Sequence, residues 1–251
     1  MESQPWVSVI MPCYNMASYI SDSIKSVVAQ TYPYWELLIV DDASTDKTVN
    51  IIETYAQSDA RIRFAVKKQN SGIADTRNQC IRMSQGRFLA FLDADDIWHP
   101  EKLEKQLKFM LEKNVGFSYS TYDWIDEEGQ TLNKFINTIG DLDYKTYLRN
   151  TIIGCSTVMV DKKITGDVVV PNFRTSEDTA TWLNILKKGV LAYAIEEPLV
   201  SYRIRRKSAS SNKIKASIDL WKVYRRNEKL PFVKAIQCFS CYAFNAIKKR
   251  L

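Results

Sequence analysis

The stretch Phe88–Trp98, which reads FLAFLDADDIW, decides how the rest of the chain is interpreted. Its first five residues are apolar, and such a run predicts a buried strand, although a buried helical turn has the same pattern. The run ends in Asp93, Asp95 and Asp96. Like charges repel unless something positive lies among them, and hard oxygen ligands suit Mg²⁺ or Mn²⁺, which share a substrate's phosphates. The alternative is a solvated loop before a helix, with Asp96 near the helix start and Pro100 in the first turn.

Before this stretch, short apolar runs alternate with helical patterns. Strands are expected at residues 7–11, 36–40, 61–66 and 88–92. Ser18 would cap the first intervening helix, and Ser44 or Thr45 the second. Alternation of this kind predicts an α/β fold, with a mostly parallel sheet and helices on both of its faces.

Three of these strands end in polar loops, at residues 12–15, 41–44 and 93–96. Ligands of such sheets bind beyond the carboxyl ends of the strands, so we expect the three loops side by side on one rim. This coincidence favours a functional role for the acidic cluster. A GxGxxG motif is absent after the first strand, which argues against an NAD-dependent enzyme.

The second half of the chain has a less regular pattern. We expect a helix at 100–113, strands at 115–122, 155–160, 190–194 and 199–204, and a hairpin turn at 126–129. Ser176 opens a further helix that contains Glu177 and Asp178 and ends at Gly189. Acidic residues in a first turn stabilise a helix by about a few tenths of a kcal/mol through its dipole. Glu177 and Asp178 therefore have a structural explanation as well as a chemical one.

Composition excludes several classes of protein. The 251 residues, 45% of them apolar, suffice for one large α/β domain, with or without an appendage. The single histidine, His99, rules out a zinc site built on histidines and fits a position at the entry to a helix. Five cysteines, an odd number in mostly apolar surroundings, indicate reduced, buried thiols and a cytoplasmic protein. We expect neither a signal peptide nor a spanning helix.

The charge is distributed unevenly. Residues 203–251 hold fourteen Lys or Arg and two Asp or Glu, a net charge of +12, whereas residues 1–202 carry −6. Apolar residues recur at helical spacing from Phe232 to Ile247, with basic residues opposite. A basic amphipathic helix is typical of a membrane surface, and the alternative is a helix packed on the body. Nucleic acid is not expected as a partner, because the body is acidic.

Five blocks of sequence carry a resemblance to a known family. They read VSVIMPCYN (7–15), ELLIVDDAST (36–45), NSGIADTRN (70–78), GRFLAFLDADDIWHPEKLEKQ (86–106) and SEDTATWLNILKKG (176–189). In this order they resemble the motifs of family 2 glycosyltransferases with the GT-A fold, a Rossmann-like sheet flanked by helices, here followed by C-terminal amphipathic helices. The whole chain is similar to bacterial enzymes that build O-antigen or capsule repeat units.

The resemblance implies a division of the chain. A catalytic domain would span residues 1–205, with a nucleotide-binding half at 1–98 and an acceptor-binding half at 99–205. Residues 206–251 would form a basic helical tail that attaches to the inner face of the cell membrane.

The resemblance also implies roles for individual residues. Pro12 and Tyr14 would line the nucleobase pocket, Asp42 would read the base edge, Arg77 would lie near the nucleotide, Asp93 and Ala94 would contact the ribose or sugar, Asp95 would hold Mn²⁺ or Mg²⁺, and Asp178 would be the catalytic base. The donor would be a UDP-hexose such as UDP-Glc, UDP-Gal or UDP-GlcNAc, and the acceptor a lipid-diphosphate-linked sugar.

These roles agree with the chemistry of glycosyl transfer. A departing nucleoside diphosphate needs its charge neutralised, which a metal does as a Lewis acid. An acceptor hydroxyl needs a carboxylate to take its proton. One base and one direct displacement predict inversion at the anomeric carbon.

Two positions depart from the family pattern. Asn184 stands where family members often carry an arginine, and the last loop has Arg205 and Arg206 where many have a histidine. Either arginine is a candidate for direct contact with the diphosphate, which would lower the dependence on metal.

Two other functions stay open. A nucleotidyltransferase would show a glycine-rich phosphate loop with a basic residue after the first strand, and PCYNMAS has neither. A non-catalytic sugar-nucleotide-binding or scaffold protein would be expected to have lost Asp95 or Asp178.

Overall fold

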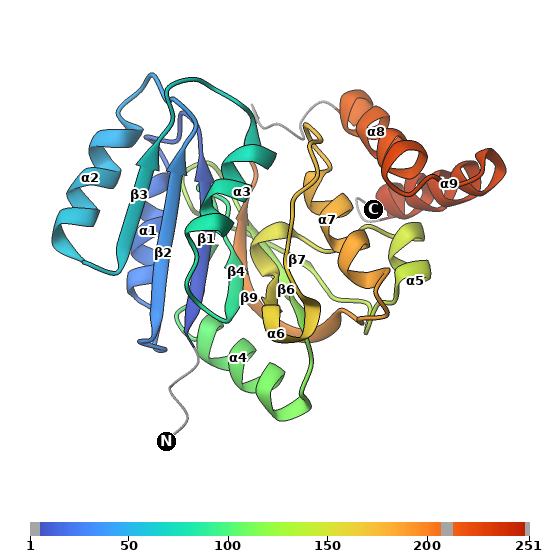
Figure 1. Cartoon of the computed structure of the whole chain (residues 1–251), viewed down its shortest axis with the longest axis horizontal. Helices are drawn as coiled ribbons and strands as arrows, with labels where there is room; N and C mark the ends of the chain where they lie inside the picture. The colour runs from blue at the N-terminus through green and yellow to red at the C-terminus, as the bar shows by residue number, and fades with distance from the viewer. Residues whose placement is uncertain (1–5, 207–212, 249–251) are drawn as a thin grey trace.

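A computed structural model of the chain describes residues 6–206 and 213–248. Within them, one mixed sheet has the strand order β3-β2-β1-β4-β8-β6-β9-β5, with β7 paired to β6 (Figure 1). The strands are β1 (Val7–Cys13), β2 (Trp35–Asp41), β3 (Ile62–Val66), β4 (Phe88–Phe91), β5 (Ile97–Trp98), β6 (Phe117–Ile125), β7 (Thr131–Ile136), β8 (Met159–Asp161) and β9 (Tyr193–Arg203).

Helices cover both faces of this sheet, and two more follow it. They are α1 (Ile20–Val28), α2 (Thr48–Ser58), α3 (Ile73–Met83), α4 (Lys102–Lys113), α5 (Tyr144–Arg149), α6 (Lys162–Thr165), α7 (Glu177–Leu186), α8 (Lys213–Lys222) and α9 (Phe232–Lys248). A 3₁₀ turn, η1, spans Cys155–Thr157, and a π-helical turn, η2, spans Val223–Asn227.

The first half of the sheet is parallel, as the alternation of strands and helices predicts. β3, β2, β1 and β4 pair in parallel, so that the polar loops after β1, β2 and β4 lie on one rim. Beyond β4 the sheet is mixed: β8 is antiparallel to both β4 and β6, whereas β9 is parallel to β6. The hairpin turn at residues 126–129 is confirmed, and it joins β6 to antiparallel β7.

Two strand predictions in the second half are wrong in detail. The run predicted at 155–160 begins as η1, where the Thr157 hydroxyl donates to the Gly154 carbonyl, and becomes a strand at Met159. The strands predicted at 190–194 and 199–204 are one strand, β9. Its pairing with β6 shifts register around Pro198, which has no N–H to donate to the ladder.

Alternate residues of the central strands build one core on each face of the sheet. In β1, Val9 and Met11 point into a cluster with residues of α1, α2 and α4, whereas Ile10 points into a cluster with residues of α3, α5 and α7. Period-two alternation with both faces buried explains why these strands read as continuous apolar runs.

The predicted helix caps are wrong, for a reason that concerns the rim. α1 and α2 begin without Ser18, Ser44 or Thr45 as caps, and the Asp46 carboxylate accepts the Thr48 N–H instead. Ser44 and Thr45 are used elsewhere, because they hold the loop after β2 against the loop after β1.

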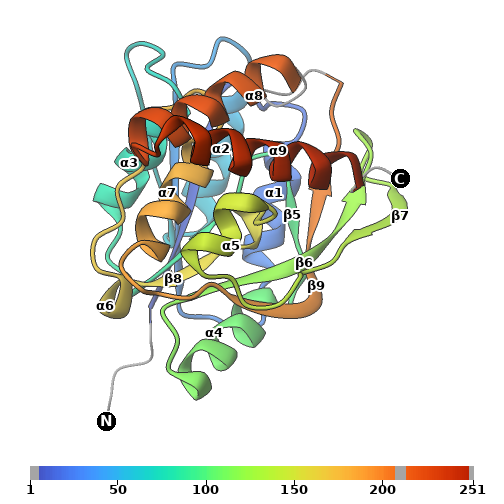
Figure 2. The same cartoon turned by 90° about the vertical axis from the view of Figure 1, so that its right-hand side faces the viewer.

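The C-terminal helices pack on the body by one face. Leu220 and Tyr224 belong to the same buried cluster as Trp182 of α7, and the Tyr224 hydroxyl donates to the Leu148 carbonyl of α5. In Figure 2, α9 runs across α5 and α7. Among the described residues no helix is long and apolar enough to cross a bilayer.

A buried carboxylate fastens this unit. Glu228, just after η2, accepts hydrogen bonds from Lys187 at 2.8 Å and from the Tyr144 hydroxyl. Beside it, the Asn227 amide donates to the Asn184 side chain of α7 at 3.0 Å. Asn184, which replaces an arginine of the family pattern, therefore contacts the tail.

Residues 207–212 of the predicted tail, the chain ends at 1–5 and 249–251, and the Ile247 side chain lie outside the description.

Candidate active site

The loops after β1 and β2 are bound to each other. Asn15, in the left-handed conformation with φ +52°, donates its N–H to the Ser44 hydroxyl at 2.8 Å, and its side-chain oxygen accepts the Thr45 N–H at 2.8 Å. Pro12, near the end of β1, is buried, whereas Tyr14, the first residue after the strand, is 43% exposed. Of the two residues predicted to line the nucleobase pocket, Tyr14 is thus the accessible one.

Asp42 organises the third segment of this rim. Its carboxylate accepts the N–H groups of Ser71 and Gly72, at 2.9 and 2.8 Å, and lies 3.4 Å from the Lys67 amine. Burial raises the pKa of Asp42, but these N–H groups and Lys67 outweigh it, so the pKa is lowered overall. Asp42 is therefore an ionised anchor of the loop before α3, and any contact with a base edge would add to these bonds.

Arg77 joins the acidic cluster to the start of α7. Its guanidinium, 2% exposed, donates to Asp93 at 2.7 Å and to Glu177 at 2.8 Å. Burial lowers the pKa of Arg77, but Cys155 and the carboxylates of Asp93, Glu177 and Asp178 outweigh it, so the pKa is raised overall. Asp93 and Glu177, which are 84 positions apart in the chain, thus lie on either side of the Arg77 side chain.

Asp96 is structural. It accepts hydrogen bonds from the Ser156 hydroxyl at 2.5 Å and from the Arg203 N–H at 3.0 Å. Burial, then the neighbouring Asp95 and Asp93, raise its pKa. The alternative in which Asp96 starts the next helix is wrong, because α4 begins only at Lys102.

Ser156 was not identified from the sequence, since it lies inside an apolar run; its hydroxyl also accepts the Asp93 N–H at 3.1 Å. Ala94 is buried in the apolar cluster beneath the loop.

Asp95 is paired with an arginine of the last loop. The Arg205 Nε lies 2.6 Å from Asp95 Oδ2, and the two side chains are 15% and 14% exposed. The Nε–H does not point at an acceptor, so this contact is an ion pair without an aligned hydrogen bond. Burial and Asp93 raise the pKa of Asp95, and Arg205 opposes them only in part.

Glu177 and Asp178 stand at the beginning of α7. Burial, with the neighbouring Asp178, raises the pKa of Glu177 to about 7 although Arg77 opposes the shift. Burial also raises the pKa of Asp178, whose carboxylate accepts the Thr179 N–H at 2.6 Å. A carboxylate with a raised pKa is a better proton acceptor, which is the property a general base needs.

The carboxylates present fit a divalent cation that arrives with phosphates. Asp95 has one oxygen outside its ion pair, and Asp93 is half-buried with one oxygen outside its bond to Arg77. The described residues contain no group of three or more metal-binding side chains. Mg²⁺ and Mn²⁺ are often held by one or two carboxylates, with substrate phosphates completing the shell.

The fold and this acidic rim fit a class of protein, the glycosyltransferases built on a mixed α/β sheet. The profile of glycosyl transferase family 2 matches residues 8–166, and the chain belongs to that family. The resemblance found in the sequence is thereby confirmed.

Relatives match along almost the whole chain. The putative teichuronic acid biosynthesis glycosyltransferase TuaG of Bacillus subtilis is 50% identical over 248 residues, which cover 99% of this chain and 98% of TuaG. The β-1,3-glucosyltransferase WfgD of Escherichia coli, which acts from UDP-Glc on α-D-GlcNAc-diphosphoundecaprenol, is 40% identical over 220 residues, 86% of this chain and 84% of WfgD.

Solved structures confirm the fold. Residues 1–349 of Staphylococcus aureus TarS, in complex with UDP-GlcNAc, align with a TM-score of 0.74 at 20% identity, over 93% of this chain and 70% of that one. The mannosyltransferase PcManGT of Pyrobaculum calidifontis, with GDP-Man and Mn²⁺, aligns with a TM-score of 0.70 at 18% identity, over 95% and 70%.

Proposed function

We propose that this glycosyltransferase moves a hexose, with inversion, from a UDP-sugar to a hydroxyl of a lipid-diphosphate-linked glycan during synthesis of a surface polysaccharide. The observation that carries the proposal is the bridge from Asp93 through Arg77 to Glu177, because it places the acidic cluster beside the start of α7. WfgD, whose name states such a donor and acceptor, supports the substrate classes.

Each group on the rim has a task in this reaction. Pro12, Tyr14 and Asp42 would hold the nucleobase. Asp93 and Ala94 would contact the ribose or sugar. Asp95 would hold a Mn²⁺ or Mg²⁺ ion that neutralises charge on the leaving diphosphate. Asp178 would take the proton of the acceptor hydroxyl, and burial favours its proton-accepting role. One base and one displacement give inversion.

A donor panel tests the reaction. Purified protein is offered UDP-, GDP- and dTDP-sugars with a lipid-diphosphate-linked sugar, with Mn²⁺ or with EDTA. We expect transfer from a UDP-sugar that EDTA abolishes, an anomeric product of inverted configuration, and loss of about 10² to 10⁴ in kcat for Asp178→Asn. Asp167→Asn, at an exposed position, is the matched control. Binding of UDP-sugar without any transfer would instead indicate a non-catalytic binding protein.

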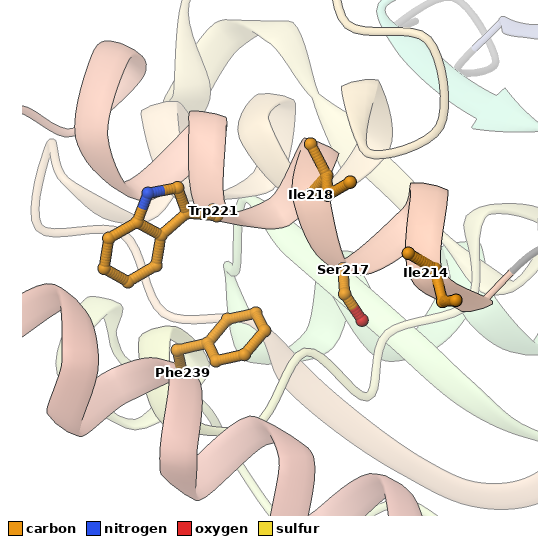
Figure 3. A pocket seen from close by; sticks show the side chains of 5 residues that line it. All are labelled: Ile214, Ser217, Ile218, Trp221 and Phe239. Carbon is orange, nitrogen blue, oxygen red and sulfur yellow. The ribbon is translucent and has the colours of Figure 1, made fainter.

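The outer face of α8 and α9 supports the predicted membrane contact, which we propose as the site of attachment. Large apolar side chains are exposed there, among them Ile214, Phe232 (60% exposed), Val233 and Phe244. A hollow of about 510 Å³ lies between the two helices, lined by Ile214, Ser217, Ile218, Trp221 and Phe239 (Figure 3). Exposed basic residues accompany this face, including Arg226, Lys229 and Lys234.

Apolar side chains beside basic ones complement the boundary between headgroups and acyl chains of an anionic bilayer. We expect Phe232→Ser to reduce sedimentation with phosphatidylglycerol vesicles, and phosphatidylcholine vesicles to bind less than anionic ones. Leu111→Ser, 43% exposed on the distant helix α4, is the control. Equal sedimentation of the two variants would contradict the proposal that the outer face of α8 and α9 is the attachment site.

A further inference from the structure

Arg205 forms an ion pair with Asp95, the carboxylate that the proposed function assigns to a divalent cation. Its Nε is 2.6 Å from Asp95 Oδ2, at a position where the pair is largely shielded from water. A guanidinium on one oxygen of Asp95 weakens the binding of a divalent cation to the other oxygen, because the two positive charges repel at this short distance. The ion pair therefore competes directly with metal binding at Asp95.

Arg205 is held more loosely than its neighbour Arg203. Arg203 donates to the Asp95 carbonyl at 2.8 Å and to the Glu127 carbonyl at 2.8 Å, and its own N–H binds Asp96. These bonds fix the end of β9 against the acidic loop without Arg205. The Arg205 side chain, by contrast, has its unaligned contact with Asp95 and the ring of Tyr19, 5.3 Å from the guanidinium carbon.

Tyr19 places this guanidinium beside the nucleotide side of the rim. The tyrosine precedes α1, at the end of the loop that carries Pro12 and Tyr14. An arginine released from Asp95 here needs another anion, and the oxygens of a diphosphate can accept two parallel hydrogen bonds from a guanidinium group.

We propose that Arg205 guards Asp95 against free divalent cations and gives it up only when a nucleotide diphosphate arrives, so that metal and nucleotide bind together. This inference rests on the proposed function, since it takes Asp95 as the metal carboxylate. Without nucleotide, Arg205 neutralises Asp95. With nucleotide, the diphosphate supplies both a new partner for Arg205 and the oxygen ligands that the rim itself lacks.

The experiment measures Mn²⁺ affinity, by electron paramagnetic resonance of the free ion, with and without UDP. In the absence of UDP, the wild type binds Mn²⁺ weakly, and Arg205→Gln binds it about tenfold to a hundredfold more tightly, because the competing charge is gone. Arg205→Met serves as a second neutral variant. Arg82→Gln, at an exposed arginine of α3, leaves the affinity as in the wild type. Adding Asp95→Asn to Arg205→Gln removes the gain.

The outcomes separate the inference from the function beneath it. If Arg205→Gln and Arg205→Met bind Mn²⁺ no more tightly than the wild type, while Asp95→Asn weakens Mn²⁺ binding in the presence of UDP, the competition is overturned and the metal assignment stands. If Asp95→Asn leaves Mn²⁺ binding with UDP unchanged, the metal assignment fails and the inference fails with it.

Discussion

Two arginines contact neighbouring carboxylates of the acidic loop in opposite ways. Arg77 is 2% exposed and makes aligned hydrogen bonds to two carboxylates, Asp93 and Glu177. Arg205 is more exposed and has one carboxylate partner, Asp95, without an aligned bond. Each arginine carries the same positive charge and contacts negatively charged carboxylates. The difference in burial and geometry indicates that Arg77 is part of the framework, whereas Arg205 is exchangeable.

The largest effect is expected at Arg77. Arg77→Gln leaves Asp93 and Glu177 without their cation, and breaking a buried ion pair costs about 3–5 kcal/mol of the free energy of unfolding. Urea denaturation measures the loss. Arg82→Gln, at an exposed position on the same helix, is the control and should stay within about 0.5 kcal/mol of the wild type. A loss at Arg77 as small as the control's would make the two arginines equivalent.

The second prediction concerns the pH dependence of this framework. The pKa of Glu177 is raised from 4.5 to about 7 on folding, so between these pH values the folded state binds more protons than the unfolded state. Stability contributed by this group is therefore complete below pH 4.5 and declines as pH rises toward 7, by at most about 3 kcal/mol. Glu177→Gln cannot titrate, so its stability relative to the wild type should rise across this range in denaturation curves. A constant difference would contradict the shifted pKa.

Lys102 extends the comparison to a basic side chain with no carboxylate partner among the described residues. It is buried, its amine lies 3.8 Å from the centre of the Trp98 ring, and burial lowers its pKa well below 10.5. The unfolded state therefore binds more protons, and wild-type stability rises with pH until the unfolded lysine also loses its charge. Lys102→Met removes the buried amine at similar volume and should stabilise the protein by about 1–2 kcal/mol at pH 7. The gain should shrink toward pH 10; thermal melts at pH 7 and 10 check it.

The smallest stability effect is expected at Arg205. Arg205→Gln should change the free energy of unfolding by about 1 kcal/mol, less than Arg77→Gln, because it removes one unaligned contact with one carboxylate and not two aligned bonds. The same urea titration that measures Arg77→Gln applies. If both substitutions cost the same, Arg205 belongs to the framework and the contrast between the two arginines disappears.

The sequence was sufficient for features that depend on local pattern. Short continuous apolar runs located β1, β2 and β4, and the rule for parallel sheets put their polar ends on one rim. The caps failed because Ser44 and Thr45 bond to Asn15, a partner about thirty positions away that propensity does not include. The role of Ser156 could not be predicted for the same reason, since the Asp96 carboxylate that accepts its hydrogen bond is far away along the chain.

The arginine partners belong to this second group. The sequence singles out Arg77, Arg205 and Arg206 as candidates for contact with the nucleotide or diphosphate, which stays a prediction. The carboxylate partners of the first two, Asp93, Glu177 and Asp95, become visible only when separate segments are brought together by the fold. The general rule is that alternation predicts where a site lies, whereas which charges face each other is a tertiary property.

The ion pair between Glu228 and Lys187 links the orientation of α7 to that of the C-terminal helices. α7 carries Asp178 in its first turn, and near its other end Asn184 and Lys187 are bonded to the turn between α8 and α9. The proposed base and the proposed attachment face are therefore connected through hydrogen bonds between one helix and one turn. If the tail lies on a membrane, its orientation there also determines the direction in which Asp178 faces an acceptor.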